Sequence, residues 1–277
     1  MAAAYNNGLI NLNGGFTTIS KASPSVSRIS PMARTVGKYV QAYAPIMNEN
    51  VYTNDWQGPF DGFRRVIETF EMTDKPRRFK PLSIYYHFYA GTKLSALRSL
   101  KEVYEWSTKQ DILPVHASYY ARKVPDFREV GVSRYLDGSW KLSRLGNIKS
   151  IRILDKNVWP ELPTSQGLVG ARQLHDGVYL HTNGTGEVLF KTVSERPSEM
   201  HLVSANGYVA AWQKSDQGVK MRIVGEVPIK LELSLAAAGC SIRSNGQLVR
   251  GNRTAQDTTL FTFSTRDTGN AILNCQA

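Results

Sequence analysis

The spacing of hydrophobic residues changes about halfway along the chain. Before residue 128, short apolar runs bounded by Gly, Pro, Asn or Ser alternate with segments in which apolar residues recur every three or four positions. The short runs predict strands over residues 9–13, 39–44, 82–88 and 112–115. The wider spacing predicts helices over residues 60–71, 94–104 and 119–127. Strands that alternate with helices indicate βα units and a parallel sheet.

The longest of these helices has a recurrent apolar set, Leu94, Leu97, Leu100 and Tyr104, with charged residues between its members. We expect this set to form the buried face of the helix, because residues three and four apart share one side.

After residue 128, short runs of alternating hydrophobic and polar residues follow one another closely. Turn signals such as Asp137-Gly138, Asn206-Gly207 and Asn245-Gly246 separate them. This pattern is typical of an antiparallel β-sandwich. We therefore expect an α/β domain over residues 1–128 and an all-β domain over residues 129–277.

Composition excludes several protein classes. Hydrophobic residues are 42% and charged residues 21% of the 277 residues, as in globular proteins. No run approaches the roughly 18 apolar residues of a membrane span. The net charge of +11 favours anionic partners. Its densest run, residues 75–80, reads as a solvated turn, and too few aromatic residues are interleaved with cations to predict a nucleic-acid partner.

The first residues have neither the basic nor the apolar region of a signal peptide. Residues 2–5 read instead as the last turn of a helix that stops at Asn7-Gly8. We therefore expect a fragment of a longer protein.

Metal-binding and redox chemistry are weakly signalled. None of the five histidines forms a pair with the three- to five-residue spacing of a metal site. Cys240 and Cys275 fall in two predicted strands. They are either buried thiols in a reducing compartment or a disulfide in an oxidising one.

Candidate site residues follow the predicted parallel strands, since binding residues of α/β folds gather at the carboxyl ends of strands. Amides and carboxylates bind sugar hydroxyls, and aromatic rings stack on pyranose faces. Each candidate also has a structural interpretation, as a turn, a loop cap or a core side chain. The candidates are Asn13, Asn48, Glu49, Asn50, Tyr52, Trp56 and His87.

One long block carries a family resemblance. The segment IYYHFYAGTKLSALRSLKEVYEWSTKQDILPVHASYY resembles the last conserved block of NodB-like polysaccharide deacetylases, in which a strand ends in a histidine. His87 stands at that histidine position. NLNGG, QAYAPIMNENVYTNDWQGPFDGFRRVIETFE and PRRFKPLSIYYHFYAGTK resemble the deacetylase domains that process Pel-type exopolysaccharide. In those envelope proteins a glycoside hydrolase domain precedes the deacetylase, and a β-sandwich follows it.

The resemblance implies a chemistry. Residues 1–128 would be the C-terminal part of a (β/α) deacetylase barrel, and residues 129–277 the β-sandwich. In the family, one Asp and two His hold a divalent, zinc-like metal whose water attacks an N-acetyl carbonyl, and a second Asp acts as base. Those residues belong to the half of the barrel that this chain lacks, so we expect it to hold no metal.

Only His87 transfers as a catalytic residue, either as the general acid for the leaving amine or as a proton donor on the oxyanion side. Residues 48–50 and Tyr52 transfer as rim residues. Phe16 departs from the pattern, because a small polar or acidic residue is expected after NLNGG.

The sequence therefore predicts a fragment of a metal-dependent de-N-acetylase that is inactive alone. Its partners would be an amino-sugar exopolysaccharide of a biofilm matrix and the exopolysaccharide export machinery, and the full-length family is periplasmic or extracytoplasmic. The alternative is a carbohydrate-binding or scaffolding module of the cell envelope. Aromatic residues of the β domain suggest it, although core packing explains each of them better than sugar binding does: Trp140, Trp159, Tyr179, Tyr208 and Trp212.

Overall fold

The computed structural model has a mixed, β-rich fold with few helices. It describes residues 1–13, 19–25, 30–44, 62–73, 79–215, 218–234, 240–254 and 258–275. The chain divides into two compact units, Met1–Pro125 and Asp126–Ala277. The predicted domain boundary, between residues 128 and 129, lies close to this division. No helix of the described ranges is long and apolar enough to cross a membrane.

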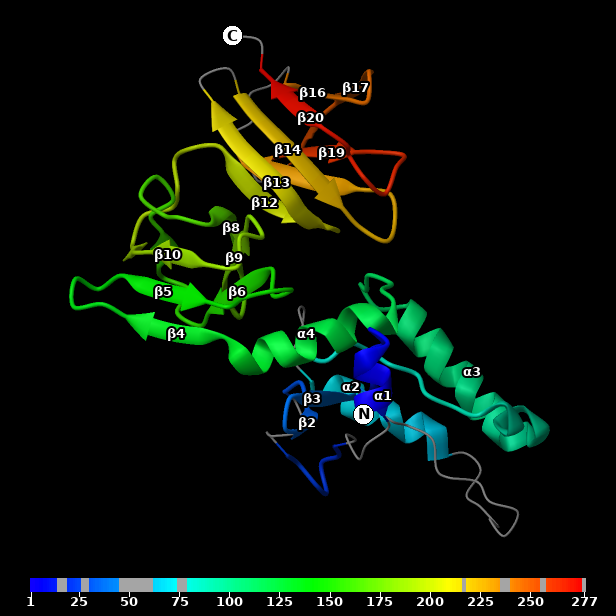
Figure 1. Cartoon of the computed structure of the whole chain (residues 1–277). Helices are drawn as coiled ribbons and strands as arrows, with labels where there is room; N and C mark the ends of the chain where they lie inside the picture. The colour runs from blue at the N-terminus through cyan, green and yellow to red at the C-terminus, as the bar shows by residue number, and fades with distance from the viewer. Residues whose placement is uncertain are drawn as a thin grey trace. The chain divides into compact units, whose positions relative to one another are not determined.

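The N-terminal unit contains a small sheet in the order β1-β3-β2. Its strands are β1 (Leu12–Asn13), β2 (Ala33–Val36) and β3 (Tyr39–Tyr43). β1 runs parallel to β3, whereas β2 pairs antiparallel with it. The described part of this unit also contains several helical segments (Figure 1). They are α1 (Ala2–Asn6), η2 (Gly62–Arg65), α2 (Val66–Glu71), η3 (Phe88–Thr92), α3 (Leu94–Thr108) and α4 (Ala117–Glu129), which carries the boundary between the units.

The predicted helices are confirmed, but the buried face of α3 differs from the expected one. Leu94 and Tyr104 are 63% and 44% exposed. The buried side is instead formed mainly by small residues. Small side chains let neighbouring segments pack closely, and hydrophobicity alone does not reveal this. The buried residues of α3 are Ala96, Ser99, Leu100, Val103 and Ser107.

Two predicted strands, over residues 82–88 and 112–115, are wrong. In the described part of the chain neither segment pairs with a strand, and Phe88 already belongs to η3. Leu82 and Ile84 nevertheless pack against small hydrophobic clusters beside α2 and α3. A short apolar run shows only that a segment is hydrophobic, whereas a strand also needs a partner that accepts its backbone hydrogen bonds.

The C-terminal unit begins with three small antiparallel sheets. β5 pairs with β4 and β10, β9 pairs with β6 and β8, and β7 pairs with β11. The bounds are β4 (Gly131–Arg134), β5 (Trp140–Ser143), β6 (Ser150–Ile153), β7 (Trp159–Pro160), β8 (Leu168–Leu174), β9 (Gly177–Thr182), β10 (Val188–Phe190) and β11 (Thr192–Val193).

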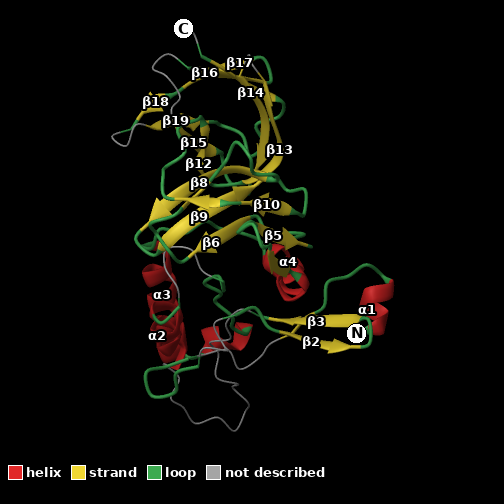
Figure 2. Ribbon diagram, turned by 90° about the vertical axis from the view of Figure 1, so that its left-hand side faces the viewer, coloured by secondary structure: helices red, strands yellow, loops and turns green. Residues whose placement is uncertain are grey.

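Two larger antiparallel sheets follow, in the orders β12-β15-β19-β18 and β13-β14-β20-β16-β17. Figure 2 shows β13 and β14 on the opposite side of this region from β12, β15 and β19. The four-stranded sheet contains β12 (His201–Ala205), β15 (Lys230–Ser234), β18 (Asn252–Arg253) and β19 (Thr258–Thr262). The five-stranded sheet contains β13 (Tyr208–Ser215), β14 (Gly218–Val224), β16 (Ser241–Ser244), β17 (Gln247–Arg250) and β20 (Ala271–Asn274).

These two sheets share one hydrophobic core. Leu231, Leu233 and Phe261 from the first sheet and Ile223 and Ile242 from the second are completely buried in the same cluster. Each strand contributes every second residue, so the inner faces interdigitate while the alternate residues face solvent.

Cys240 and Cys275 form a disulfide. They extend the register in which Ser241 of β16 lies opposite Asn274 of β20. The bond therefore fastens two neighbouring strands of the five-stranded sheet and resolves the choice that the sequence left open.

Candidate functional site

His87 lies immediately before η3, where the chain turns from the segment after α2 toward α3. Its backbone is extended, with φ −97° and ψ 155°, and its carbonyl accepts a 3.0 Å hydrogen bond from the amide of Ala90. The local geometry therefore places the imidazole where an extended segment ends and a helical segment begins. The sequence predicts this arrangement for a histidine at a strand end, although here the preceding segment is unpaired.

The side chain of His87 contacts Tyr85. The Tyr85 Oη and His87 Nε2 atoms lie 3.4 Å apart, a hydrogen bond whose direction depends on the histidine tautomer. The two rings meet edge to face, with centroids 5.4 Å apart. His87 is half-buried, whereas the neighbouring Phe88 is 96% exposed. The imidazole is thus partly accessible to a bound molecule, and the Tyr85 ring lies against it.

Asn13 ends β1 and is exposed. Its backbone lies opposite Tyr43, and its carbonyl oxygen accepts a 2.7 Å hydrogen bond from the amide of Ala44. The side chain thus stands at the carboxyl end of a strand that runs parallel to its neighbour, as the sequence predicts. His87 lies immediately before η3 and Asn13 ends β1, so the two candidate residues come from different parts of the N-terminal unit.

Five predicted site residues lie outside the described residues. They are Asn48, Glu49, Asn50, Tyr52 and Trp56.

Metal binding has no candidate cluster in the described ranges. No group of three or more His, Cys, Asp or Glu side chains there could hold a metal ion. His87 and its neighbour Tyr85 do not provide the three protein ligands of a catalytic metal site. No metal-dependent step is therefore derived from these residues.

The aromatic residues of the β domain divide into two groups. Trp159 and Tyr179 are buried, at 9% and 3% exposure. Tyr179 donates a 2.5 Å hydrogen bond to Asp176, which also accepts one from Arg152 at 2.9 Å. Both residues are thus parts of the interior rather than sugar platforms. Trp140, Tyr208 and Trp212 are half-buried.

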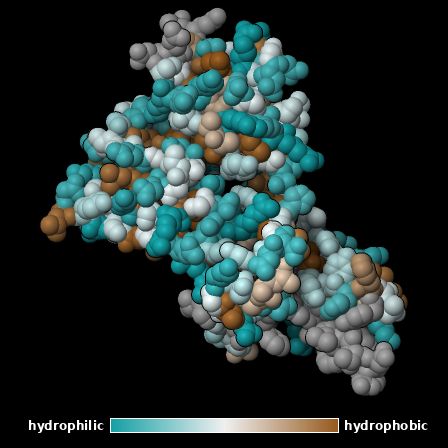
Figure 3. Space-filling view, in the orientation of Figure 1, coloured by the Kyte–Doolittle hydropathy of each residue, from teal (hydrophilic) through white to brown (hydrophobic). Residues whose placement is uncertain are grey.

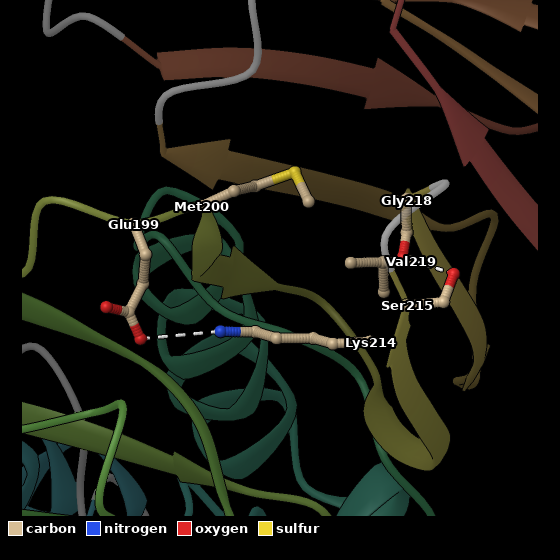
Figure 4. Close-up of a pocket in the computed structure, with 6 residues that line it drawn as sticks. All are labelled: Glu199, Met200, Lys214, Ser215, Gly218 and Val219. Carbon is tan, nitrogen blue, oxygen red and sulfur yellow. Dashed lines mark hydrogen bonds and ion pairs between the residues drawn. The ribbon is translucent and has the colours of Figure 1, made fainter.

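A small cavity in the C-terminal unit lies between the start of β12 and the β13–β14 hairpin. Its volume is about 150 Å³. The Lys214 ammonium and Glu199 carboxylate lie 3.4 Å apart across it (Figure 4). Met200 and Val219 provide its apolar wall. Ligand pockets usually enclose about 300–1,000 Å³, so this cavity suits a few atoms at most.

His201 follows this cavity along β12 but is completely buried. Its Nδ1 donates a 2.8 Å hydrogen bond to the Glu199 carbonyl oxygen, while its Nε2 has no partner among the described residues. Burial lowers the pKa of His201, and the nearby cations Arg196 and Lys214 act in the same direction. His201 is therefore a neutral core residue and not an acid–base group of the cavity.

The sequence does not point to Glu199 and Lys214 as a pair. They are fifteen positions apart, and only the folded positions of the segment before β12 and the end of β13 bring them together. No spacing rule of helices or strands would have paired them.

Comparison with known proteins assigns no family, because no family model, curated protein or solved structure matches this chain.

Proposed function

We propose that this chain is the C-terminal part of a metal-dependent polysaccharide de-N-acetylase, with His87 as its proton donor. On this proposal, residues 1–128 contribute to a (β/α) deacetylase barrel, and residues 129–277 form the β-sandwich that follows it. The substrate class is an N-acetylhexosamine exopolysaccharide, and the metal belongs to residues outside this chain.

The observation that supports this proposal most is the position of His87. It combines a resemblance over a long block with a half-buried imidazole at the junction of an extended segment and a helix. A general acid must reach the leaving nitrogen within hydrogen-bond distance, and it needs an orienting partner. The Tyr85 hydroxyl, 3.4 Å from Nε2, supplies that partner.

The disulfide supports the proposed location outside the cytoplasm. Disulfides persist in oxidising compartments such as the periplasm and are rare in a reducing cytosol. A bond between Cys240 and Cys275 accordingly suits a protein of the cell envelope.

The mass of the natural protein tests the proposal first. An antiserum against residues 129–277 would recover the product from cells, and mass spectrometry would measure it intact. A mass far above 30.9 kDa supports a larger deacetylase. A mass near that value contradicts it and favours a binding or scaffolding module.

Histidine NMR of the full chain tests His87 itself. We expect an N-acetylhexosamine oligomer to shift the ring signals that disappear in His87→Gln, and to leave those that disappear in His116→Gln unchanged. Because the proposal places the metal ligands outside this chain, the chain should not deacetylate the oligomer when zinc is added. Turnover that a chelator abolishes would show that the chain has its own metal site and would refute this part of the proposal.

A further inference from the structure

The five-stranded sheet has an outer face whose residues are aligned by strand pairing. One row of paired residues crosses all five strands. Gln213 of β13 lies opposite Lys220 of β14, which lies opposite Ile272 of β20. Ile272 in turn lies opposite Arg243 of β16, which lies opposite Leu248 of β17. All five side chains are exposed. Their strand neighbours Met221, Ile242 and Leu273 are buried at 1% exposure or less, so the row faces away from the core.

The charges on this sheet have one sign. Its five strands contain five Lys or Arg residues and no Asp or Glu. Lys214 is paired with Glu199, and Arg222 is paired with Asp267 at 2.6 Å. Lys220, Arg243 and Arg250 form no ion pair with the described residues. Arg250 belongs to the same face, because it lies two residues from Leu248 on β17.

Two aliphatic side chains stand among these cations. Ile272 is 42% exposed and Leu248 is 52% exposed, and Arg243 separates them in the row. Figure 3, drawn in the orientation of Figure 1, shows hydrophilic side chains with hydrophobic ones between them over this sheet. We call Lys220, Arg243, Arg250, Leu248 and Ile272 the basic sheet face.

We propose that the basic sheet face docks on the surface of an anionic lipid membrane. Cations near such a surface are attracted by the lipid phosphates, and exposed aliphatic groups gain by entering the boundary between headgroups and acyl chains. The basic sheet face presents cations and aliphatic side chains next to one another on the outer surface of a sheet. A membrane surface is also broad and open, so all of these side chains can reach it together. This inference does not depend on the proposed deacetylase activity.

A membrane suits the basic sheet face better than a soluble polyanion. Single-stranded nucleic acids are held by aromatic side chains that stack on bases, and sugars are commonly held in the same way. The cross-strand row contains no aromatic residue. Aliphatic side chains between cations add nothing to the binding of a phosphate or carboxylate, whereas they add affinity for a bilayer.

Sedimentation of the full chain with vesicles tests the proposal. We expect binding to vesicles of phosphatidylcholine mixed with phosphatidylglycerol, and little binding to phosphatidylcholine alone. The triple variant Lys220→Gln, Arg243→Gln and Arg250→Gln should bind at least about tenfold more weakly, because each cation near an anionic surface adds affinity. The matched control neutralises three exposed cations of α3 and its C-cap, as Arg98→Gln, Lys101→Gln and Lys109→Gln, and should bind like the unmodified chain.

A second variant separates a membrane from a soluble polyanion. Leu248→Ser with Ile272→Ser keeps every charge and should still weaken vesicle binding severalfold. Circular dichroism checks that each variant is folded, and Arg243→Gln alone serves if the triple variant is not.

Three results would overturn the proposal. One is equal binding to both kinds of vesicle, and another is an equal loss in the α3 control. The third combines two observations. The chain binds polygalacturonate, an acidic polysaccharide, and the triple variant loses this binding, whereas the Leu248→Ser, Ile272→Ser variant binds vesicles as well as the unmodified chain does. That result would assign the basic sheet face to an acidic glycan instead.

Discussion

The two units bury hydrophobic residues very differently. The C-terminal unit has a core cluster of fifteen buried residues and a second cluster of eight. The clusters of the N-terminal unit contain only three or four buried residues each. Of the nineteen large hydrophobic side chains that the described residues expose, thirteen lie before residue 126. Several of these, including Leu12, Tyr86 and Ile112, fall on segments that the sequence predicts as buried strands.

Strand pairing shows the same contrast. β13 and β14 are aligned over seven residue pairs, whereas β1 and β3 are aligned over two. Partners in the C-terminal unit are often consecutive in the chain, so a short turn brings them together. A parallel sheet needs partners that are distant in sequence. The contrast shows that a hydrophobic segment of strand length joins a sheet only where a partner strand is present.

Removal of a large core side chain should produce the largest difference between the units. We expect Phe261→Ala to lower the free energy of unfolding of the C-terminal unit by about 3–5 kcal/mol, because it leaves a cavity in a large core. Phe70→Ala, in a cluster of three buried residues, should cost less, since fewer neighbours hold the cavity open. Urea unfolding followed by hydrogen exchange in each unit measures both, and equal losses would contradict the comparison.

Reduction of the disulfide should affect only the C-terminal unit. A bond that closes a loop with a sequence separation of 35 should stabilise by about 3–4 kcal/mol in the chain-entropy model. The melting temperature should therefore fall when dithiothreitol is added, while exchange in α2 and α3 stays the same. The variant Cys240→Ser with Cys275→Ser is the control and should not respond to dithiothreitol. An unchanged melting temperature of the parent chain would refute the prediction.

Gly170→Ala tests the close contact between β8 and β12. A Cβ at Gly170 would lie 1.9 Å from the carbonyl oxygen of Leu202, so the strands must separate. We expect a loss of about 2–3 kcal/mol, at the upper end for overpacking. Gly91→Ala in η3 is the matched control, because its Cβ would meet nothing within 4 Å. Thermal denaturation measures both, and a loss at position 91 as large as that at position 170 would be inconsistent with this packing.

Acid pH should have the smallest effect. The folded pKa of His201 lies below 6.5 because of burial, so the unfolded chain takes up a proton that the folded chain does not. The stabilisation is complete above pH 6.5 and decreases as pH falls toward the folded pKa, by at most about 1.4 kcal/mol per pH unit. Urea unfolding between pH 7 and pH 5 measures this slope, which should be smaller in His201→Gln. The dependence of the unfolding free energy on pH should persist in the control His116→Gln. If it is also unchanged in His201→Gln, His201 is not its source.

The sequence predicted some turns well. Asn245-Gly246 closes the β16–β17 hairpin with positive φ angles of 47° and 81°, as its residue types favour. The similar Asn206-Gly207 instead connects β12 and β13, which belong to different sheets. The turn signal is local, but the choice of sheet depends on which residues the following strand can bury.

The candidate site residues also divide into those that local sequence indicates and those that only tertiary packing brings together. The sequence identified His87, and the structure adds its contact with Tyr85 two residues away. The Glu199–Lys214 pair and the basic sheet face could not be predicted, because strands distant in sequence bring their residues together.

By itself, the sequence determined the helices, the change to an all-β region near residue 128 and most strands of that region. These features follow from the periodicity of single segments and from turn residues, which act over a few positions. Only the tertiary structure decided that residues 82–88 and 112–115 remain unpaired, that small residues form the buried side of α3, and that Cys240 bonds to Cys275. Each of these depends on which surface lies opposite, and that is a property of the packed chain.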